Sequence, residues 1–194
     1  MTAHPAASSI LIVASSTSAV TKLWDMLESP NTDLVPAATA EEAGRLLGSE
    51  HFDIVIINAP LSDGFGSDFA VRLAETTTSA ILLLVKAELY EKASELVCPN
   101  GVMTLSKPFS RQMLRQTIRL LTVMRARLLR LNAEKDTLQE KFDDMKLVNR
   151  AKLLLMERLK MTESEAHRYI EKQAMNTGSR RRQVAENIIR TYED

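Results

Sequence analysis

The sequence predicts an α/β domain with a five-stranded parallel sheet, followed by a long coiled-coil helix and three short carboxyl-terminal helices. Three observations support this prediction: apolar runs that alternate with helical segments, a stretch without glycine or proline over residues 110–160, and a capped helical pattern near the end. A chain of 194 residues can form one domain of about 110–130 residues and an appended element.

Short apolar runs mark the five expected strands, at residues 10–14, 34–37, 54–58, 81–85 and 102–105. Segments typical of helices, or of connections that contain a helix, lie between them at residues 18–28, 40–49, 67–76 and 88–97. Apolar runs without alternation indicate strands that are buried on both faces. Strands that alternate with helices indicate a parallel sheet, whose ligands usually bind at the carboxyl ends of the strands.

The residues at these strand ends resemble the receiver domain of two-component response regulators, a flavodoxin-like fold. The resemblance covers roughly residues 8–122 and rests on the order of elements, on FDIVIIN at 52–58 and on SKPF at 106–109. In the receiver family an acidic pair binds Mg²⁺, and an aspartate that ends the third strand accepts the phosphoryl group. A Ser or Thr ends the fourth strand, and a Lys-Pro pair follows the fifth.

Only Lys107 matches these receiver positions, so we interpret the set as a degenerate phosphorylation site, formed by Ser15, Ser16, Asn58, Val85 and Lys107. Ser15 and Ser16 are neutral and cannot replace a carboxylate pair that binds a cation. Asn58 carries an amide, which does not accept a phosphoryl group, and Val85 has no hydroxyl. We therefore interpret residues 1–122 as a pseudo-receiver domain without phosphotransfer, metal or cofactor. In it Lys107 is expected to bond strand-end groups such as Asn58, and Asp63 to form a turn.

A single long helix is expected to begin after Ser110, which is a good helix N-cap. Apolar residues then alternate at 3- and 4-residue spacing, and Lys135 occupies one position of the same seam. This pattern predicts a coiled coil over residues 110–147. Residues 110–122 are expected to be the last receiver-like helix, but nothing else in the chain is left to cover the rest of the seam. We therefore expect a homodimer that forms through Leu121, Met124, Leu128, Leu131, Leu138, Phe142 and Met145.

The last segment, residues 145–194, predicts three helices around a small core. A break is expected at Met161–Thr162, followed by a capping box of Thr162 and Glu165, and Gly178 suits the end of the second helix. The expected core residues repeat at helical spacing and are Val148, Ala151, Leu155, Leu159, Ala166, Ile170, Ala174, Val184, Ile188 and Ile189.

This pattern resembles the ANTAR domain of bacterial transcription antiterminators over about residues 145–190. The motif appears as Ala151-Lys152, Leu155-Met156, Glu163, Glu165-Ala166, Ala174-Met175, Val184-Ala185 and Ile188-Ile189. His167 departs from it, because many members have Tyr there, and so does the longer NTGSRRR at 176–182. The order of the three parts is similar to that of amidase-operon antiterminators. The resemblance implies that the protein binds paired hairpins in a leader mRNA and prevents formation of a terminator hairpin.

The charge distribution agrees with a nucleic-acid partner. Residues 1–109 carry 6 Lys and Arg against 13 Asp and Glu, whereas residues 110–194 carry 19 against 12. Such an asymmetry suggests a contact with nucleic acid or a membrane in the basic half. Arginines at 180–182 would lie at a helix amino end, where the helix dipole disfavours cations unless an anion is bound. The candidate RNA-binding residues are Arg150, Lys152, Lys160, Arg168, Tyr169, Lys172, Arg180, Arg181 and Arg182.

Other functions fit the sequence less well. The three histidines, His4, His51 and His167, and Cys98 lack the spacing of a metal site or catalytic triad, so we do not expect an enzyme. The absence of a signal peptide and of a membrane span predicts a cytoplasmic protein without membrane contact. Two alternatives remain: a DNA-binding regulator that reads the groove with residues 179–192, and a phosphorylation-responsive receiver. Without a phosphoryl switch, we expect control either by a partner that sequesters the dimer or by exposure of its RNA-binding face. The similarity to amidase-operon antiterminators implies that such a partner is a sensor protein.

Overall fold

The computed structural model describes residues 8–30 and 32–193. The chain forms two compact units, Met1–Leu129 and Arg130–Asp194, and the helix α5 (Arg111–Leu159) has residues in both. Residues 1–7 lie outside the described residues. They include His4 and the first part of the amino-terminal segment in which we expect no signal peptide.

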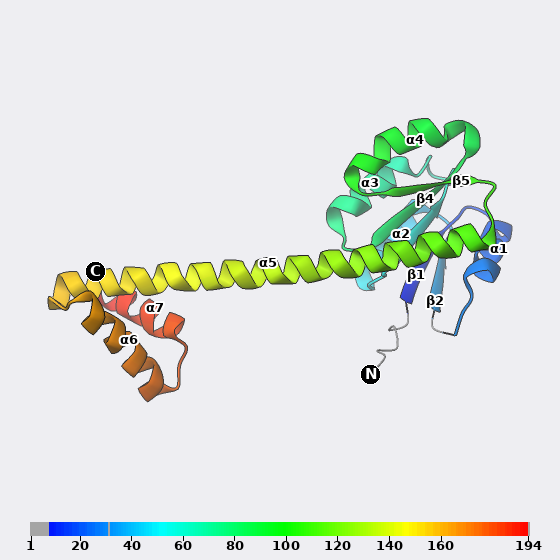
Figure 1. Ribbon diagram of the computed structural model, residues 1–194. Coiled ribbons are helices and arrows are strands. Elements are labelled where there is room, and N and C mark those ends of the chain that lie inside the picture. The colour runs from blue at the N-terminus through cyan, green and yellow to red at the C-terminus, as the bar shows by residue number, and fades with distance from the viewer. Residues whose placement is uncertain (1–7, 31, 194) are drawn as a thin grey trace. The chain divides into compact units, whose positions relative to one another are not determined.

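The first unit contains a five-stranded parallel sheet with the strand order β2-β1-β3-β4-β5 (Figure 1). In the centre, Ile54 of β3 pairs with Ile10 of β1 and with Ala80 of β4. The expected strands are confirmed, each within two residues of its expected bounds. They are β1 (Ser8–Val13), β2 (Thr32–Ala37), β3 (Ile54–Asn58), β4 (Ala80–Lys86) and β5 (Met103–Lys107).

Helices cover both faces of this sheet. The helices α2 (Ala40–Ser49), α3 (Ser67–Thr76) and α4 (Tyr90–Val97) pack on one face, and α1 (Thr17–Leu27) and α5 pack on the other. Short 3₁₀ turns flank α4 at Ala87–Leu89 and Cys98–Asn100. Alternate residues of β1 enter different cores: Leu11 and Val13 face α2, α3 and α4, whereas Ile10 and Ile12 face α1 and α5. Burial on both faces explains why the strands have continuous apolar sequences.

The first part of α5 completes the domain. The Ser110 hydroxyl accepts a hydrogen bond from the Met113 amide at 3.1 Å, as expected of an N-cap. Leu114 and Leu121 are buried against the sheet, together with the half-buried Ile118. These residues repeat at helical spacing, so one face of α5 packs on the sheet over its first three turns.

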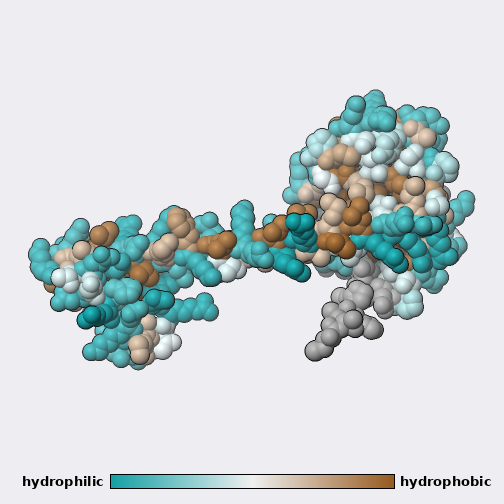
Figure 2. Space-filling view, in the orientation of Figure 1, coloured by the Kyte–Doolittle hydropathy of each residue, from teal (hydrophilic) through white to brown (hydrophobic). Residues whose placement is uncertain are grey.

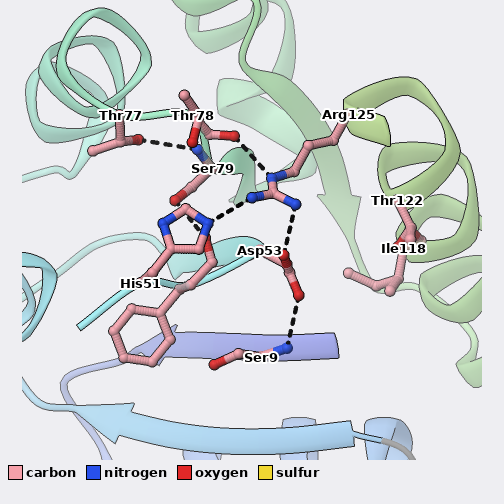
Figure 3. A network of polar contacts seen from close by, with 10 residues as sticks. Ser9, His51, Asp53, Thr77, Thr78, Ser79, Ile118, Thr122 and Arg125 are labelled. Atoms are coloured by element: carbon pink, nitrogen blue, oxygen red, sulfur yellow. Dashed lines mark hydrogen bonds and ion pairs between the residues drawn. The ribbon is translucent and has the colours of Figure 1, made fainter. Parts of the chain in front are cut away.

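Arg125 joins α5 to the amino-terminal edge of the sheet (Figure 3). Its guanidinium forms an ion pair with Asp53 at 2.6 Å, donates to the Thr78 carbonyl at 2.9 Å and contacts His51 Nε2 at 2.6 Å. The second oxygen of the Asp53 carboxylate accepts from the Ser9 amide of β1 at 3.1 Å. Arg125 therefore contacts two segments of the domain, residues 51–53 and Thr78, and is connected to β1 through Asp53. It lies one turn beyond the last buried leucine of the sheet-facing part of α5.

Between Met124 and Met145, large apolar side chains of α5 are exposed to solvent, and Figure 2 shows a band of apolar residues along this helix. Leu121 differs from the other residues of the expected seam, because it is only 6% exposed and belongs to the core of the first unit. It cannot contact a partner helix, so a seam would begin at Met124. The exposed seam residues are Met124, Leu128, Leu131, Leu138, Phe142 and Met145.

In the second unit, the last part of α5 packs with α6 (Glu163–Thr177) and α7 (Arg181–Tyr192). The expected capping box is present: the Thr162 hydroxyl accepts from the Glu165 amide, and the Glu165 carboxylate accepts from the Thr162 amide. Gly178 ends α6 with a φ of 62°, a left-handed conformation that favours glycine. The buried core consists of Ala151, Leu155, Ala166, Ile170, Ala174, Val184, Ala185 and Ile188.

The expected break at Met161–Thr162 is present, because residues 160–162 lie between α5 and α6. The helix α5 ends at Leu159, and Lys160 adopts a left-handed φ of 53°. One detail of this bundle differs from the sequence prediction. Leu159, which we expected in the core, is 41% exposed. The early turn at Lys160 ends the helix at Leu159, so Leu155 is the last core residue of α5 that is buried.

Candidate functional site

A groove of about 660 Å³ lies on the second unit, between α5 and the start of α7. We call it the basic groove, because five basic side chains but only one carboxylate, that of Asp144, line it. His167 of α6 and Ser179 of the following loop also line it. The five basic residues are Lys141, Lys152, Arg180, Arg181 and Arg182.

The structure brings four of the nine predicted RNA-binding residues into the basic groove, namely Lys152, Arg180, Arg181 and Arg182. Tyr169 lines a second, separate hollow and packs against the bundle core. The remaining four predicted residues do not line the groove, although all are exposed: Arg150, Lys160, Arg168 and Lys172.

Carboxylates of the same unit pair with several of the predicted cations. Arg182 Nη1 lies 2.9 Å from Asp144 Oδ1, and Arg182 Nε lies 2.9 Å from Glu186 Oε1. The hydrogen bonds that Arg182 donates, first to Glu186 and then to Asp144, raise the pKa of Arg182 above its ordinary value. Arg181 pairs with Glu171 at 3.6 Å. The pairs are exposed to solvent, where water and salt screen them, so a phosphate group can compete for the arginines.

Two other predicted cations, which do not belong to the first turn of α7, also form ion pairs with carboxylates. Lys152 Nζ donates to Glu163 at 2.9 Å, and this hydrogen bond lowers the pKa of the Glu163 carboxyl. Arg150 pairs with Glu193. Among the residues that the structure describes, the remaining predicted cations form no ion pair: Lys160, Arg168, Lys172 and Arg180.

The three arginines at residues 180–182 lie at the amino end of α7, as the sequence predicts. Arg180 occupies the N-cap position, and its side chain makes no capping hydrogen bond. Positive charge at a helix amino end is unfavourable, because the helix dipole places partial positive charge there. The carboxylates of Asp144, Glu171 and Glu186 offset part of this cost for Arg181 and Arg182. Arg180 is therefore the groove arginine that is best placed to accept an external anion.

The first unit contains the degenerate receiver site at the carboxyl ends of β3 and β5. Lys107 Nζ donates to Asn58 Oδ1 at 3.0 Å and to the Ala59 carbonyl at 2.6 Å, which confirms the expected bond between Lys107 and Asn58. Burial lowers the pKa of Lys107, and the nearby charge of Lys86 lowers it further. The lysine thus bonds two neutral oxygens where the receiver family has a carboxylate.

The other receiver positions have structural contacts. Ser15 Oγ donates to the Pro60 carbonyl at 3.3 Å, and Ser16 Oγ caps α1 by accepting from the Ala19 amide at 3.2 Å. Val85 is buried in β4. Asp63 does more than form a turn, because its carboxylate accepts from the Glu41 amide at the amino end of α2. Although desolvation acts to raise its pKa, hydrogen bonds from the amides of Ala40, Glu41 and Asp63 itself lower it.

The described part of the chain contains no cluster of three or more His, Cys, Asp or Glu side chains that could bind a metal ion. Within the same residues, no helix is both long enough and apolar enough to cross a membrane. Neither finding adds a functional site to the basic groove and the degenerate receiver site.

The ANTAR domain family matches residues 136–189, which contain every residue that lines the basic groove. A transcriptional regulatory protein of Mycobacterium tuberculosis, PdtaR, is 30% identical over 173 residues, which cover 87% of this chain and 83% of that protein. The chain belongs to this family of ANTAR regulators. The shared length includes both units, so the likeness is not confined to the carboxyl-terminal bundle.

Solved structures resemble the amino-terminal part of this ANTAR regulator. The signal receiver domain of an HD domain-containing protein from Pseudomonas fluorescens Pf-5 has a TM-score of 0.59 and 24% identity, and the match covers 67% of this chain and 97% of that one. A CheY-like receiver domain from Methanospirillum hungatei has a TM-score of 0.57 and 20% identity, over 62% and 97% of the two chains. These matches show that the first unit has the receiver fold.

Sequence reasoning missed two contributors to the basic groove of the ANTAR regulator, Lys141 and Asn149. Lys141, Val148 and Lys152 are separated by seven and four residues, so they lie on one face of α5. That spacing was a usable signal, but Lys141 lies in the segment that we interpreted as coiled coil.

Proposed function

We propose that this protein is an RNA-binding regulator of transcription antitermination. As a homodimer, it binds paired hairpins in a leader mRNA and prevents formation of the terminator, and protein contact rather than phosphorylation controls it. The observation that carries the proposal is the basic groove on the bundle that matches the ANTAR family. The protein performs this function in the cytoplasm, where the polymerase makes leader transcripts.

The composition of the basic groove supports an RNA partner. Arg180, Arg181 and Arg182 present guanidinium groups, which suit phosphate because their planar donors can form paired hydrogen bonds. Lys152 and Lys141 add charge from α5 along the same groove. The apolar face of α7, formed by Val184, Ala185 and Ile188, is buried in the bundle. This burial leaves only the polar faces of α7 for nucleic acid.

The exposed seam of α5 supports the homodimer. Large apolar side chains such as Leu138, which is 66% exposed, lie at coiled-coil spacing, and burying them against a second copy is favourable. Two copies would place two basic grooves in one particle. A leader with two linked hairpins then gains affinity, because binding of the first hairpin raises the effective concentration of the second.

The degenerate receiver site supports control by a protein partner. Asn58 accepts a hydrogen bond from Lys107, and Ser15 and Ser16 supply hydroxyls in place of a carboxylate pair. These groups offer neither a phosphoryl acceptor nor the ligands that Mg²⁺ prefers. The order of domains, similar to that of amidase-operon antiterminators, favours a sensor protein that sequesters the dimer in the absence of a signal.

Fluorescence anisotropy with the full-length protein tests the proposed RNA binding. The probe is a synthetic RNA of two linked hairpins with randomised loops, enriched by rounds of binding to the protein, and the competitor is unrelated duplex DNA. We expect selective binding that weakens with salt, because phosphate contacts release counterions. Equal affinity for the RNA and the DNA would contradict the proposal.

A matched pair of arginine variants assigns the contact to the groove. Arg180→Gln removes a groove cation that has no ion pair within the described residues. It should reduce the slope of log affinity against log salt by about 0.7, the value for one lost phosphate contact on a single strand. Arg158→Gln removes an exposed cation of α5 outside the groove and should leave the slope unchanged. Equal slopes for the two variants would place the contact elsewhere.

A further inference from the structure

The second unit has another hollow, between α6 and α7, with a volume of about 270 Å³. We propose that this inter-helix hollow binds one unpaired nucleobase from a hairpin loop. The inference rests on the proposed function, because the base belongs to the same RNA whose phosphates contact the basic groove. It adds a site that reads the identity of a base, whereas the basic groove reads only charge.

The lining of the inter-helix hollow mixes polar and apolar side chains. Tyr169 and Gln173 extend from α6, and Asn187 and Tyr192 extend from α7. No Lys, Arg, Asp or Glu within the described residues lines it. This lining differs from that of the basic groove, where five basic side chains gather. An uncharged hollow next to a cationic one is suited to a neutral, flat group rather than to a phosphate.

The two tyrosines can stack on a base. Both are half-buried and pack against the bundle core, so their rings are partly immobilised before a ligand binds. Val184 and Ile188 of α7, each 7% exposed, supply apolar lining. Unpaired bases stack on aromatic rings, and this interaction is available to every base because each has a π-face.

The amides and hydroxyls supply hydrogen bonds for the edge of a base. Among the described residues, the Gln173 side chain makes no hydrogen bond, whereas Asn187 Oδ1 accepts from Arg190 Nη2 at 2.8 Å. The hydroxyls of Thr177 and Thr191 donate to main-chain carbonyls at 2.8 Å, so they can only accept from a ligand. Carboxamides offer a donor and an acceptor side by side, the pattern by which Asn and Gln recognise base edges.

Position and size favour a base over other occupants. Ser179 lines both the inter-helix hollow and the basic groove, so neighbouring nucleotides can place a phosphate in one and a base in the other. The volume of 270 Å³ is slightly below the range of about 300–1,000 Å³ typical of small-molecule sites. A partner helix would need a longer apolar groove, and hydroxyls and amides surround this one.

The test uses the full-length protein and the selected two-hairpin RNA described above. Each loop position is replaced in turn by an abasic nucleotide, and affinity is measured for the wild type, for Gln173→Ala and for Asn187→Ala. Gln183→Ala and Asn176→Ala are matched controls, because these exposed amides of α7 and α6 do not line the hollow. Thermal unfolding of each variant shows whether the bundle stays folded.

At one loop position, the abasic replacement should weaken wild-type binding by roughly 5-fold to 150-fold, the effect of one lost stacked base. The same replacement should change the affinity of Gln173→Ala and Asn187→Ala several-fold less, while the control variants should behave like the wild type. All variants should keep the wild-type salt slope, because no phosphate contact is removed.

The outcomes separate this inference from the proposed function. If the wild type selects hairpins but the hollow variants respond to every abasic position as the wild type does, the base site is wrong and RNA binding stands. If the two variants lose affinity equally for intact and abasic loops, the hollow is also not a base site. If the wild type selects no RNA, the proposed function fails, and the base site fails with it.

Discussion

Replacing Leu138 by alanine is predicted to dissociate the proposed homodimer without unfolding either unit. Leu138 lies in the middle of the exposed seam of α5, and its side chain is 66% exposed in the single chain. It contributes to none of the hydrophobic cores of the described residues. Alanine has the highest helix propensity, so the substitution should preserve α5 itself.

The size of the effect follows from the exposed fraction. Complete burial of a leucine side chain contributes about 1.5–3 kcal/mol. Because two-thirds of Leu138 is available for burial and a dimer contains two copies, the substitution should cost about 2–4 kcal/mol per dimer. That loss corresponds to a roughly 30-fold to 1,000-fold increase in the Kd of dimerisation.

Sedimentation equilibrium over a range of protein concentrations measures this change. Leu129→Ala is the matched control, because Leu129 precedes Leu138 by nine residues and at 100° per residue lies on the opposite side of α5. The control should dimerise like the wild type. A monomeric wild type at high concentration, or equal Kd values for Leu138→Ala and Leu129→Ala, would refute the assignment of the seam.

Three further predictions concern single contacts. Arg125→Ala should lower the free energy of unfolding of the first unit by about 1–3 kcal/mol, because it removes charge-assisted hydrogen bonds from a partly buried site. Urea titrations measure this change, and a loss near zero would show that the network contributes nothing to stability. Thr162→Ala should destabilise the second unit by about 1 kcal/mol, measured by thermal unfolding, because it removes a helix cap. Since the backbone amide of Thr162 lowers the pKa of Glu165, the stability of the wild type relative to Glu165→Gln should fall as the pH drops below 4.5, the ordinary value of that carboxyl. A difference between the two proteins that stays constant with pH would contradict this. Because the pKa of Lys107 is lowered, the unfolded chain binds more protons than the folded chain at alkaline pH. The stability of the wild type relative to Lys107→Met should therefore rise as the pH approaches 10.5. Asn58→Asp should reverse that trend and should not accept phosphate from a small phosphodonor with Mg²⁺; a stable acyl phosphate would contradict this.

The receiver fold could be predicted from the sequence because its signal is local. Each strand is a continuous apolar run, and each lies next to a helix, so the parallel sheet follows from rules about burial and connection. Lys107 could be paired with Asn58 in advance, because both residues lie at the carboxyl ends of strands in one sheet. The contact between Asp63 and the amino end of α2 joins segments 22 residues apart and had no local signal.

The long helix shows where periodicity is ambiguous. Leu121 fits the same 3-and-4 spacing as Leu138, but the sheet covers the former and solvent surrounds the latter. Spacing reveals which residues share a face of a helix, whereas the tertiary fold decides what that face contacts. The sequence placed the end of the core-facing part near residue 122, but it also assigned Leu121 to the seam, and only the structure shows that Leu121 belongs to the core.

The sequence indicated which segment carries the clustered cations, but not how these side chains are arranged or which carboxylates pair with them. Three adjacent arginines at residues 180–182 marked the segment, yet their partners Asp144 and Glu171 belong to other helices. The inter-helix hollow had no signal of its own, because Gln173 and Asn187 are ordinary polar residues of helix surfaces. Only the packing of α6 against α7 brings these residues to one site.

Transcription through a terminator tests the central claim most directly. The template encodes the selected two-hairpin RNA, with its second hairpin overlapping the stem of a terminator, and read-through is measured in single-round reactions with purified polymerase. The account predicts that the full-length protein increases read-through without any phosphodonor, and that Arg180→Gln and Leu138→Ala require higher protein concentrations. Unchanged read-through at concentrations that saturate the same RNA would contradict it.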